Sequence, residues 1–417
     1  MFEGLSAKKI LVIILLLAAF LRLYRINYPN AYVFDEVYHA FTAKEYLLGH
    51  KEAWEWWNTP PPGVAYEWTH PPLAKEVMAA SMFLVRSTDA WAYRFPGILL
   101  GIFSVYMIYL LGKLLFKEES AGLIAAFIFS LDGLNFVQSR TGMNDIYFVT
   151  FMLVSLFFFL KKRYFYSALF LGLTLASKWA GIYLVGLYLL LIFNQIFKEF
   201  RAKNLNLKNY LGKLYLLFIP PIVYFISYIP LFLQGDGLDI FWGLQKQMWW
   251  YHTGLKATHD YASPWWSWPL NLYPVWYFVE YHKNNTISNI FTSGNPALFW
   301  VGSGAILVSI WDFWKTKSHG LFISLLGFFV FWLPWAVSPR IMFLYHFSPS
   351  VPFLSLILGY QIHMATGRKN DKLLLGIILG LIVLGFIFVY PLLTGIPLPK
   401  NILELFFKSN LTKNPFG

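Results

Sequence analysis

The chain has 417 residues, of which 58% are hydrophobic, 20% aromatic and only 13% charged. Soluble globular domains carry about a quarter charged residues, so this composition excludes an ordinary soluble protein. The chain has no cysteine, which excludes a disulfide framework and a thiolate metal site. A net charge of +12 would suggest a nucleic-acid partner in a soluble protein. In a membrane chain, basic residues gathered on one side of the bilayer explain the charge, and we predict no nucleic-acid partner.

Eleven apolar runs are long enough to cross or nearly cross a bilayer, which takes about 20 helical residues. In chain order they cover residues 10–24, 92–112, 120–138, 146–160, 164–177, 179–197, 214–233, 296–314, 321–338, 345–363 and 373–390. The first run also has the Lys-Lys start and short core of a cleaved signal peptide, but Arg22 and Arg25 occupy the place of a small-residue cleavage site. We therefore expect an uncleaved anchor.

Basic clusters give an independent check on this count of eleven. They are Lys8–Lys9, Lys113/Lys117, Lys161–Arg163, Lys198–Lys213, Lys315/Lys317 and Arg368/Lys369/Lys372. With a cytoplasmic N-terminus, every cluster falls on the cytoplasmic side of an eleven-span chain, as the positive-inside rule requires. The sequence thus predicts an all-α, multi-pass protein of the plasma membrane with about eleven spans.

In this topology two long stretches, residues 25–91 and 234–295, lie outside the membrane, with a further tail after residue 390. The first stretch predicts two short helices, one over residues 36–48 that Gly49 ends, and one that starts at Pro71–Pro72. Neither is long or apolar enough to span the bilayer. We expect both to lie along the membrane surface.

Two adjacent carboxylates, Asp35 and Glu36, stand in the sequence FDEVYH at the start of this external stretch. One interpretation is structural: Asp35 caps the following helix and Glu36 is a first-turn acid favoured by the helix dipole. The other interpretation is catalytic. Because adjacent helix positions diverge by about 100°, only one of the two can point at a reacting atom, so we expect one base and one supporting acid.

Six motifs in the same order resemble those of the protein O-mannosyltransferases. They are FDEVYHA with THPPLAK, WAYRFPGILLG (91–101), LDGLNFVQSRTGMNDIYF (131–148), LASKWAGIY (175–183), YHTGLKATHDYASPWWSWPL (251–270) and MFLYHFSPSVPFL (342–354). The stretch 234–295 is too short for the β-trefoil insertion of eukaryotic members, so the chain resembles a prokaryotic one. The third motif, in the second external loop, reads Gly142–Met143–Asn144 before Asp145, where the family more often has apolar residues.

The resemblance implies a GT-C membrane fold and an inverting transfer of mannose from a polyprenyl phosphate to Ser or Thr of exported polypeptides. It implies that Asp35 is the base that takes the hydroxyl proton, with Glu36 in support. We expect residues 1–233, with the external stretch 25–91, to form the catalytic region. Residues 234–417 would hold the second external stretch and four further transmembrane helices.

Loss of a lipid phosphate as leaving group calls for cations, and the Arg fork and the Lys ammonium are the side chains that bind phosphate. By resemblance, the residues that bind the donor phosphate or the substrate are Arg94, His70, Lys75, Arg140, Asp145, Lys178, Arg340 and His346. Each has a plainer alternative. Arg94 could snorkel from a span, Lys75 could lie on the wet face of a surface helix, and His346 could be a neutral ring bonded to backbone.

No cofactor is firmly implied, and a divalent cation is left open. His252, His259 and Asp260 include metal-ligand types, but their spacing fits no face of a helix.

The expected partners are a polyprenyl-phosphate-sugar donor, a Ser/Thr-containing polypeptide and, in the cell, the export machinery. Two other functions stay open: transfer of the sugar to a lipid or glycan by an enzyme of the same fold, and a transporter or flippase.

Overall fold

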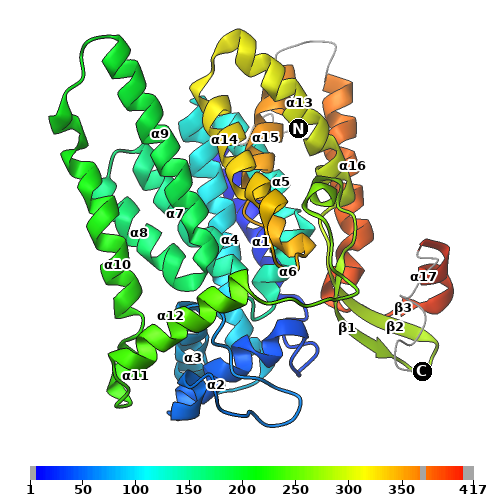
Figure 1. Ribbon diagram of the computed structural model, residues 1–417. Helices are drawn as coiled ribbons and strands as arrows, with labels where there is room; N and C mark the ends of the chain where they lie inside the picture. The colour runs from blue at the N-terminus through cyan, green and yellow to red at the C-terminus, as the bar shows by residue number, and fades with distance from the viewer. Residues whose placement is uncertain (1–5, 367–371, 407–417) are drawn as a thin grey trace.

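The computed structural model describes residues 6–366 and 372–406, and they form a long bundle of helices (Figure 1). The bundle helices are α1 (Ala7–Leu23), α4 (Ala90–Phe116), α5 (Glu119–Ser130), α6 (Gly133–Arg140), α7 (Asp145–Leu160), α8 (Tyr164–Ser177), α9 (Ile182–Arg201), α10 (Tyr215–Ile226), α11 (Ile229–Leu233), α13 (Pro296–Thr316), α14 (His319–Trp332), α15 (Val351–Thr366) and α16 (Lys372–Thr394). Each of the eleven predicted apolar runs folds as helix.

Within the part of the chain that the structure describes, six helical segments are long and apolar enough to cross a membrane: α4, the segment containing α9, the segment containing α10 and α11, α13, the segment containing α14, and α16. A seventh span results if α5 and α6, which meet at a bend of 62°, cross together. Helices α7, α8 and α15 are apolar but shorter. The protein is therefore a multi-pass membrane protein, and the exact count of eleven stays a prediction.

Small residues let the central helices approach closely. A Cβ on Gly112 of α4 would lie 2.7 Å from the Cα of Gly122 in α5, and one on Gly359 of α15 would lie 2.7 Å from Ala125 Cβ. Tight approach through small residues is the usual means of helix association where lipid removes most of the hydrophobic drive. The contacts fix α4, α5 and α15 as the centre of the bundle.

The remaining elements gather at one end of the bundle, drawn at the lower side of Figure 1. They are α2 (His39–Leu48), α3 (Leu73–Val85), α12 (Leu238–Thr253), β1 (Val275–Tyr281), β2 (Thr286–Thr292), β3 (Leu398–Pro399) and α17 (Lys400–Phe406). Two short helices, α2 and α3, form where the sequence predicts them, and their position along the membrane surface stays a prediction. Gly49 ends α2 with a left-handed φ of 73°, and Pro72 stands at the N-cap of α3.

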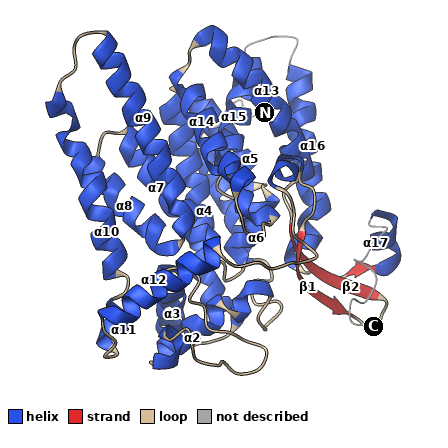
Figure 2. Cartoon of the chain, in the orientation of Figure 1, coloured by secondary structure: helices blue, strands red, loops and turns tan. Residues whose placement is uncertain are grey.

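One expectation for this end of the molecule was wrong. The helix expected over residues 36–48 begins only at His39, and Asp35 lies before it in a 3₁₀ turn, η1 (Phe34–Val37), so it does not cap α2. The predicted helical fold class is confirmed, and a small sheet that the sequence analysis did not predict is added to it. Strands β1, β2 and β3 form an antiparallel sheet in the order β1-β2-β3, shown red in Figure 2.

Candidate active site

A cavity of about 620 Å³ opens at the end of the molecule that carries α2, α3 and α12. Its walls come from six separate parts of the chain: the η1 turn with the start of α2, the segment before α3, the start of α7, Lys178 after α8, the end of α12 with the segment after it, and the segment that leads into η7 (Leu344–Phe347). Among its lining residues are Asp35, His39, Glu67, His70, Asp145, Lys178, Arg340 and His346. The cavity thus collects six of the ten residues that the sequence and the resemblance suggest.

Asp35 presents its carboxylate to this cavity from the η1 turn. Among the described residues no group donates a hydrogen bond to this carboxylate, although the main-chain oxygen of Asp35 accepts from the Tyr38 N–H at 3.0 Å. Burial raises the pKa of Asp35 to about 6, against the opposing fields of His39 and Lys178. A carboxylate that is ionised just below neutral pH and has no protein partner is suited to accept a proton from a bound hydroxyl.

The backbone beside Asp35 is held in an unusual conformation. Phe34 has a φ of 46°, in the left-handed region that costs energy for a residue with a Cβ. Its ring stacks on Tyr277 of β1 with centroids 4.1 Å apart. The stacking fixes the strained turn and, with it, the direction of the Asp35 side chain.

Glu36 turns away from the cavity into the protein and forms a buried ion pair with Arg94 of α4. Arg94 Nε donates to Glu36 Oε1 and Nη2 to Oε2, both at 2.7 Å, in a bidentate arrangement. The Val33 and Gly142 backbone N–H groups also donate to the Glu36 carboxylate, at 2.9 and 2.8 Å. Glu36 is therefore an anchor for the turn that carries Asp35.

Arg94 has no free donor for a phosphate. Besides Glu36, its guanidinium donates to the carbonyl oxygens of Ile26, Pro29 and Ala31 at 3.0–3.1 Å, and only 1% of the residue is exposed. The expectation that Arg94 binds the donor phosphate finds no support in this placement.

Arg140 also lies outside the cavity. It is buried, and its guanidinium donates to the Arg22, Tyr24 and Leu393 carbonyl oxygens at 3.0, 2.5 and 3.5 Å. Through these bonds α6 is joined to the ends of α1 and α16. Its position indicates a structural role rather than the substrate contact that the resemblance suggested.

Glu67, which sequence reasoning did not single out, is the centre of a buried network on the cavity wall. Its carboxylate accepts from the Lys75 ammonium and from the Thr69 hydroxyl, and it lies 3.1 Å from His70 Nδ1. His39 Nδ1 lies 3.6 Å away. Burial acts to raise the pKa of Glu67, but the charge of Lys75 and the hydrogen bonds from the His39 and His70 rings outweigh it and hold the pKa well below its usual range.

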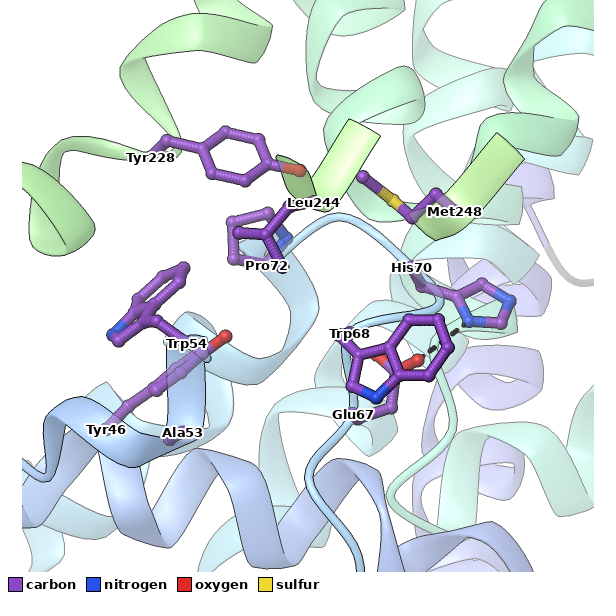
Figure 3. A pocket seen from close by; sticks show the side chains of 10 residues that line it. All are labelled: Tyr46, Ala53, Trp54, Glu67, Trp68, His70, Pro72, Tyr228, Leu244 and Met248. Atoms are coloured by element: carbon purple, nitrogen blue, oxygen red, sulfur yellow. Dashed lines mark hydrogen bonds and ion pairs between the residues drawn. The ribbon is translucent and has the colours of Figure 1, made fainter. Parts of the chain in front are cut away.

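Figure 3 shows the Glu67–His70 contact beside a small pocket. Trp54 and Met248 of α12 also line this pocket. Lys75 does not line the large cavity. Besides the Glu67 carboxylate, its ammonium donates to the main-chain carbonyl oxygens of Glu67 and His70, at 3.0 and 2.9 Å. The substrate contact expected of Lys75 is thus replaced by a role in fixing the segment before α3.

A second cavity of about 770 Å³ lies next to the first, towards the bundle. Its walls are largely apolar and come from α9, α10 and the segment after α14, with Tyr183, Pro220, Tyr224 and Trp335 among the residues. Three residues line both cavities: Lys178, Arg340 and His346. A polar cavity and an apolar one therefore meet at two cations and an imidazole.

The three shared residues are held by partners around the junction. Lys178 Nζ pairs with the Asp145 carboxylate at 2.9 and 3.0 Å. Arg340 Nη1 lies 2.5 Å from His252 Nδ1, and Arg340 Nε donates to the Ile341 carbonyl oxygen at 3.3 Å. Burial lowers the pKa of His346 well below its usual range, so this ring is neutral and contributes no charge.

Metal binding has no support from the clustering of side chains. Within residues 6–366 and 372–406, no group of three or more His, Asp or Glu side chains stands where it could hold a metal ion. His252 instead contacts the Thr69 carbonyl oxygen through Nε2 at 3.1 Å.

Two family descriptions match consecutive parts of the chain. Residues 12–233 match "Dolichyl-phosphate-mannose-protein mannosyltransferase", and residues 237–411 match "C-terminal four TMM region of protein-O-mannosyltransferase". Among curated proteins, the polyprenol-phosphate-mannose–protein mannosyltransferase of Mycobacterium tuberculosis is 25% identical, over 93% of this chain and 87% of its own. The protein of the same name from Corynebacterium glutamicum is 23% identical, over 80% and 79%.

Solved structures share the fold at low identity. The S. cerevisiae protein O-mannosyltransferase Pmt1-Pmt2 complex bound to the sugar donor superimposes with a TM-score of 0.81 at 15% identity, covering 97% of this chain and 92% of that one. ArnT from Cupriavidus metallidurans bound to undecaprenyl phosphate gives a TM-score of 0.62 at 14% identity, covering 89% and 63%. The predicted GT-C membrane fold is confirmed. With the match over residues 12–233, these findings establish that the chain belongs to the dolichyl-phosphate-mannose–protein mannosyltransferase family and is a membrane glycosyltransferase.

Proposed function

We propose that the protein transfers mannose from a polyprenyl-phosphate donor to Ser or Thr hydroxyls of exported polypeptides. The observation that carries the proposal is the junction of the two cavities at Lys178, Arg340 and His346. A polyprenyl-phosphate sugar has an apolar chain, an anionic phosphate and a polar hexose in that order. The apolar cavity, the two cations and the polar cavity follow the same order.

In this arrangement Arg340 and Lys178 bind the phosphate, and the hexose lies in the cavity that Asp35 lines. Asp35 takes the proton of the acceptor hydroxyl while its oxygen forms a bond to C1 of the sugar. The bond between C1 and the phosphate oxygen breaks, and its electron pair leaves with the lipid phosphate. One displacement of this kind inverts the anomeric centre, and it needs one base and a stabilised leaving group.

The cations act on charge that develops as the phosphate leaves. Charged hydrogen bonds contribute roughly 1.5–3 kcal/mol each, which corresponds to about 10- to 100-fold in rate when the contact is made in the transition state. Asp145 holds Lys178 at the junction, and His252 holds Arg340. We assign Lys178 and Arg340 to the donor phosphate, and Asp145 to positioning.

The orientation in the membrane is part of the proposal. With the N-terminus in the cytoplasm, the end that carries α2, α3 and α12 faces the outside, where exported polypeptides arrive. The basic connection between α9 and α10 then lies in the cytoplasm.

The test is a transfer assay with purified protein in lipid nanodiscs. Radiolabelled polyprenyl-phosphate mannose and a Ser/Thr-rich peptide are supplied, with the same peptide carrying Ala in place of Ser and Thr as the control. We expect label only in the hydroxyl-bearing peptide. Label that instead enters a lipid or glycan acceptor would show that the enzyme belongs to a different branch of the same fold, and the protein-acceptor proposal would then be wrong.

A further inference from the structure

We propose that Glu67 is a positioning residue that holds the His70 imidazole as a hydrogen-bond acceptor for a hydroxyl of the sugar being transferred. The inference rests on the proposed function, since it concerns the hexose of the donor. It assigns a role to Glu67 and a chemical form to His70, and it differs from the phosphate contact that the resemblance suggested for His70.

The tautomer of His70 follows from what surrounds Nδ1. Nδ1 lies 3.1 Å from Glu67 Oε1 and 2.8 Å from Thr69 Oγ1. The ionised Glu67 carboxylate can only accept, and the Thr69 hydroxyl donates its own hydrogen to the same Glu67 oxygen. Both neighbours of Nδ1 are acceptors, so Nδ1 must carry the hydrogen.

His70 Nε2 is then a hydrogen-bond acceptor without a partner among the described residues. With the hydrogen on Nδ1, a neutral imidazole has its lone pair on Nε2. Among the described residues Nε2 of His70 makes no hydrogen bond, and the ring lines the same cavity as Asp35. Burial lowers the pKa of His70 well below its usual range in spite of the nearby Glu67 carboxylate, so the ring stays neutral.

A neutral acceptor suits a hydroxyl and not a phosphate. A ring without charge gives an anionic phosphate no attraction, and its free nitrogen has no hydrogen to donate. The hydroxyl groups that enter this cavity are those of the acceptor residue and those of the hexose. The acceptor hydroxyl gives its proton to Asp35 in the reaction, which leaves the hexose hydroxyls to bond His70 Nε2.

Glu67 can serve this purpose because it cannot move. The Lys75 ammonium binds its carboxylate and also the main-chain carbonyl oxygens of Glu67 and His70, and both charged side chains are almost completely buried. The Thr42 hydroxyl accepts from the Glu67 N–H at 2.8 Å. The carboxylate, the ring and the segment between them therefore form one rigid unit on the cavity wall.

The experiment compares natural and deoxy donors. Polyprenyl-phosphate mannose and its 2-, 3-, 4- and 6-deoxy analogues are transferred to one Ser/Thr peptide by wild type, Glu67→Gln and Glu45→Gln. In Glu67→Gln the amide NH₂ can donate to Nδ1, which moves the ring hydrogen to Nε2, as when an amide replaces the carboxylate of a carboxylate–histidine pair. Glu45→Gln is the matched control, because Glu45 of α2 also forms a carboxylate–histidine pair. Its carboxylate lies 2.8 Å from His50 Nδ1, and Glu45 does not line the cavity.

In wild type we expect one deoxy donor to lose about tenfold in kcat/KM, the size of one hydrogen bond. That loss should disappear in Glu67→Gln and persist in Glu45→Gln. ¹⁵N NMR of the His70 ring should show hydrogen on Nδ1 in wild type and on Nε2 in Glu67→Gln. A merely structural role of Glu67 would lower the rate of every donor by the same factor and leave the deoxy loss intact, which would overturn the inference.

Glu67→Gln removes the charge that pairs with buried Lys75, and the variant could fail to fold for that reason. A second variant covers this case. His70→Phe keeps the Glu67–Lys75 pair and the ring volume but has no acceptor, so the deoxy loss must vanish in it as well. A deoxy loss that persists in His70→Phe would contradict the inference. If wild type transfers no mannose from the natural donor, the proposed function itself fails, which is a distinct result.

Discussion

At the scale of single residues, two neighbouring carboxylates have opposite surroundings. The Asp35 carboxylate accepts no hydrogen bond from the described residues, whereas Glu36 is fully buried and its carboxylate accepts from Arg94 and from two backbone N–H groups. A carboxylate without protein partners is free to take a proton from a substrate, whereas one that is paired with an arginine is held in its ionised form. These surroundings support the proposal that Asp35 is the base, and they make Glu36 an anchor.

Replacing Asp35 with Asn tests the base directly. The amide has nearly the same volume, but it cannot take a proton, and loss of a general base costs about 100- to 10,000-fold in rate. We expect thermal stability and donor binding close to wild type with peptide transfer reduced by that factor. Asp89→Asn, an exposed Asp at the start of α4, is the control and should transfer normally. Near wild-type transfer by Asp35→Asn would rule Asp35 out as the base.

The pH dependence of transfer reports the same carboxylate. Burial raises the pKa of Asp35 to about 6, and the base is active only when ionised. The rate should therefore be level above about pH 7 and fall as pH drops through 6, approaching tenfold per unit below it. The measurement is kcat/KM for the peptide between pH 5 and 8 with saturating donor. An acidic limb near pH 4, the ordinary range of an exposed carboxyl, would contradict this assignment.

At the scale of elements, the η1 turn is tied to the start of α4 through Glu36 and Arg94. Arg94 donates to Glu36 and to three carbonyl oxygens of the segment between α1 and η1. A planar fork with five donors can satisfy all of these acceptors at once, and an ammonium cannot. One side chain thus connects the segment that carries the base to the bundle.

Arg94→Lys should accordingly damage the fold of this segment. Each buried carbonyl that loses its donor costs roughly 1–3 kcal/mol, so we expect a clear drop in the thermal unfolding midpoint together with reduced transfer. Donor binding by the protein that remains folded should be close to normal, since Arg94 does not reach the cavity. Arg86→Lys, on an exposed Arg that ends α3, serves as the comparison and should change neither. Normal stability together with a loss of donor affinity in Arg94→Lys would contradict this structural role and would indicate that Arg94 binds the donor phosphate.

The helical elements could be predicted from the sequence because hydropathy alone determines which runs enter a bilayer. Local signals also placed the end of α2 at Gly49 and the start of α3 after Pro72, since both residues restrict the backbone at their own position. Strands β1 and β2 were missed. Their sequences, VWYFVEY and TISNIFT with an Asn-Asn turn between them, are typical of a hairpin, but the surrounding helices obscured the pattern.

Site residues were predictable only as types of side chain. Asp35 was identified through its motif, and the structure places it in the cavity. That Arg94 contacts Glu36, 58 positions away, depends on how α4 meets the external segment, and no local pattern encodes it. Glu67 lies among aromatic residues in a turn-rich stretch, and only its spacing of three from His70 hinted at a pair.

At the scale of the whole molecule, the site draws on both halves of the chain. Asp35, Glu67 and Lys178 come from residues 1–233, whereas Arg340 and His346 come from residues 234–417. The two regions expected from the sequence, residues 1–233 and 234–417, therefore both contribute side chains to the site. The two cations at the junction reach it from different halves, so the phosphate site proposed above needs both halves of the chain.

The orientation of this site in the membrane can be tested with single cysteines, because the chain has none of its own. Cysteine at Glu52, which is exposed beside α2, should react with an impermeant reagent added outside intact cells. Cysteine at Asn206, between α9 and α10, should react only after permeabilisation. Labelling in the reverse pattern would place the candidate site in the cytoplasm and refute the proposed orientation.

The apolar cavity between α9, α10 and the segment after α14 has a consequence for how the enzyme encounters its donor. Among its lining residues Ile182 is 57% exposed and Val337 84% exposed, although both are apolar and belong to segments that are long and apolar enough to cross a membrane. We infer that the cavity opens to the hydrocarbon phase of the bilayer. On this inference the donor arrives by lateral diffusion in two dimensions, and the variable that governs saturation is its mole fraction among the surrounding lipids. Diluting it with inert phospholipid should slow the enzyme even when the amount of donor per volume is constant.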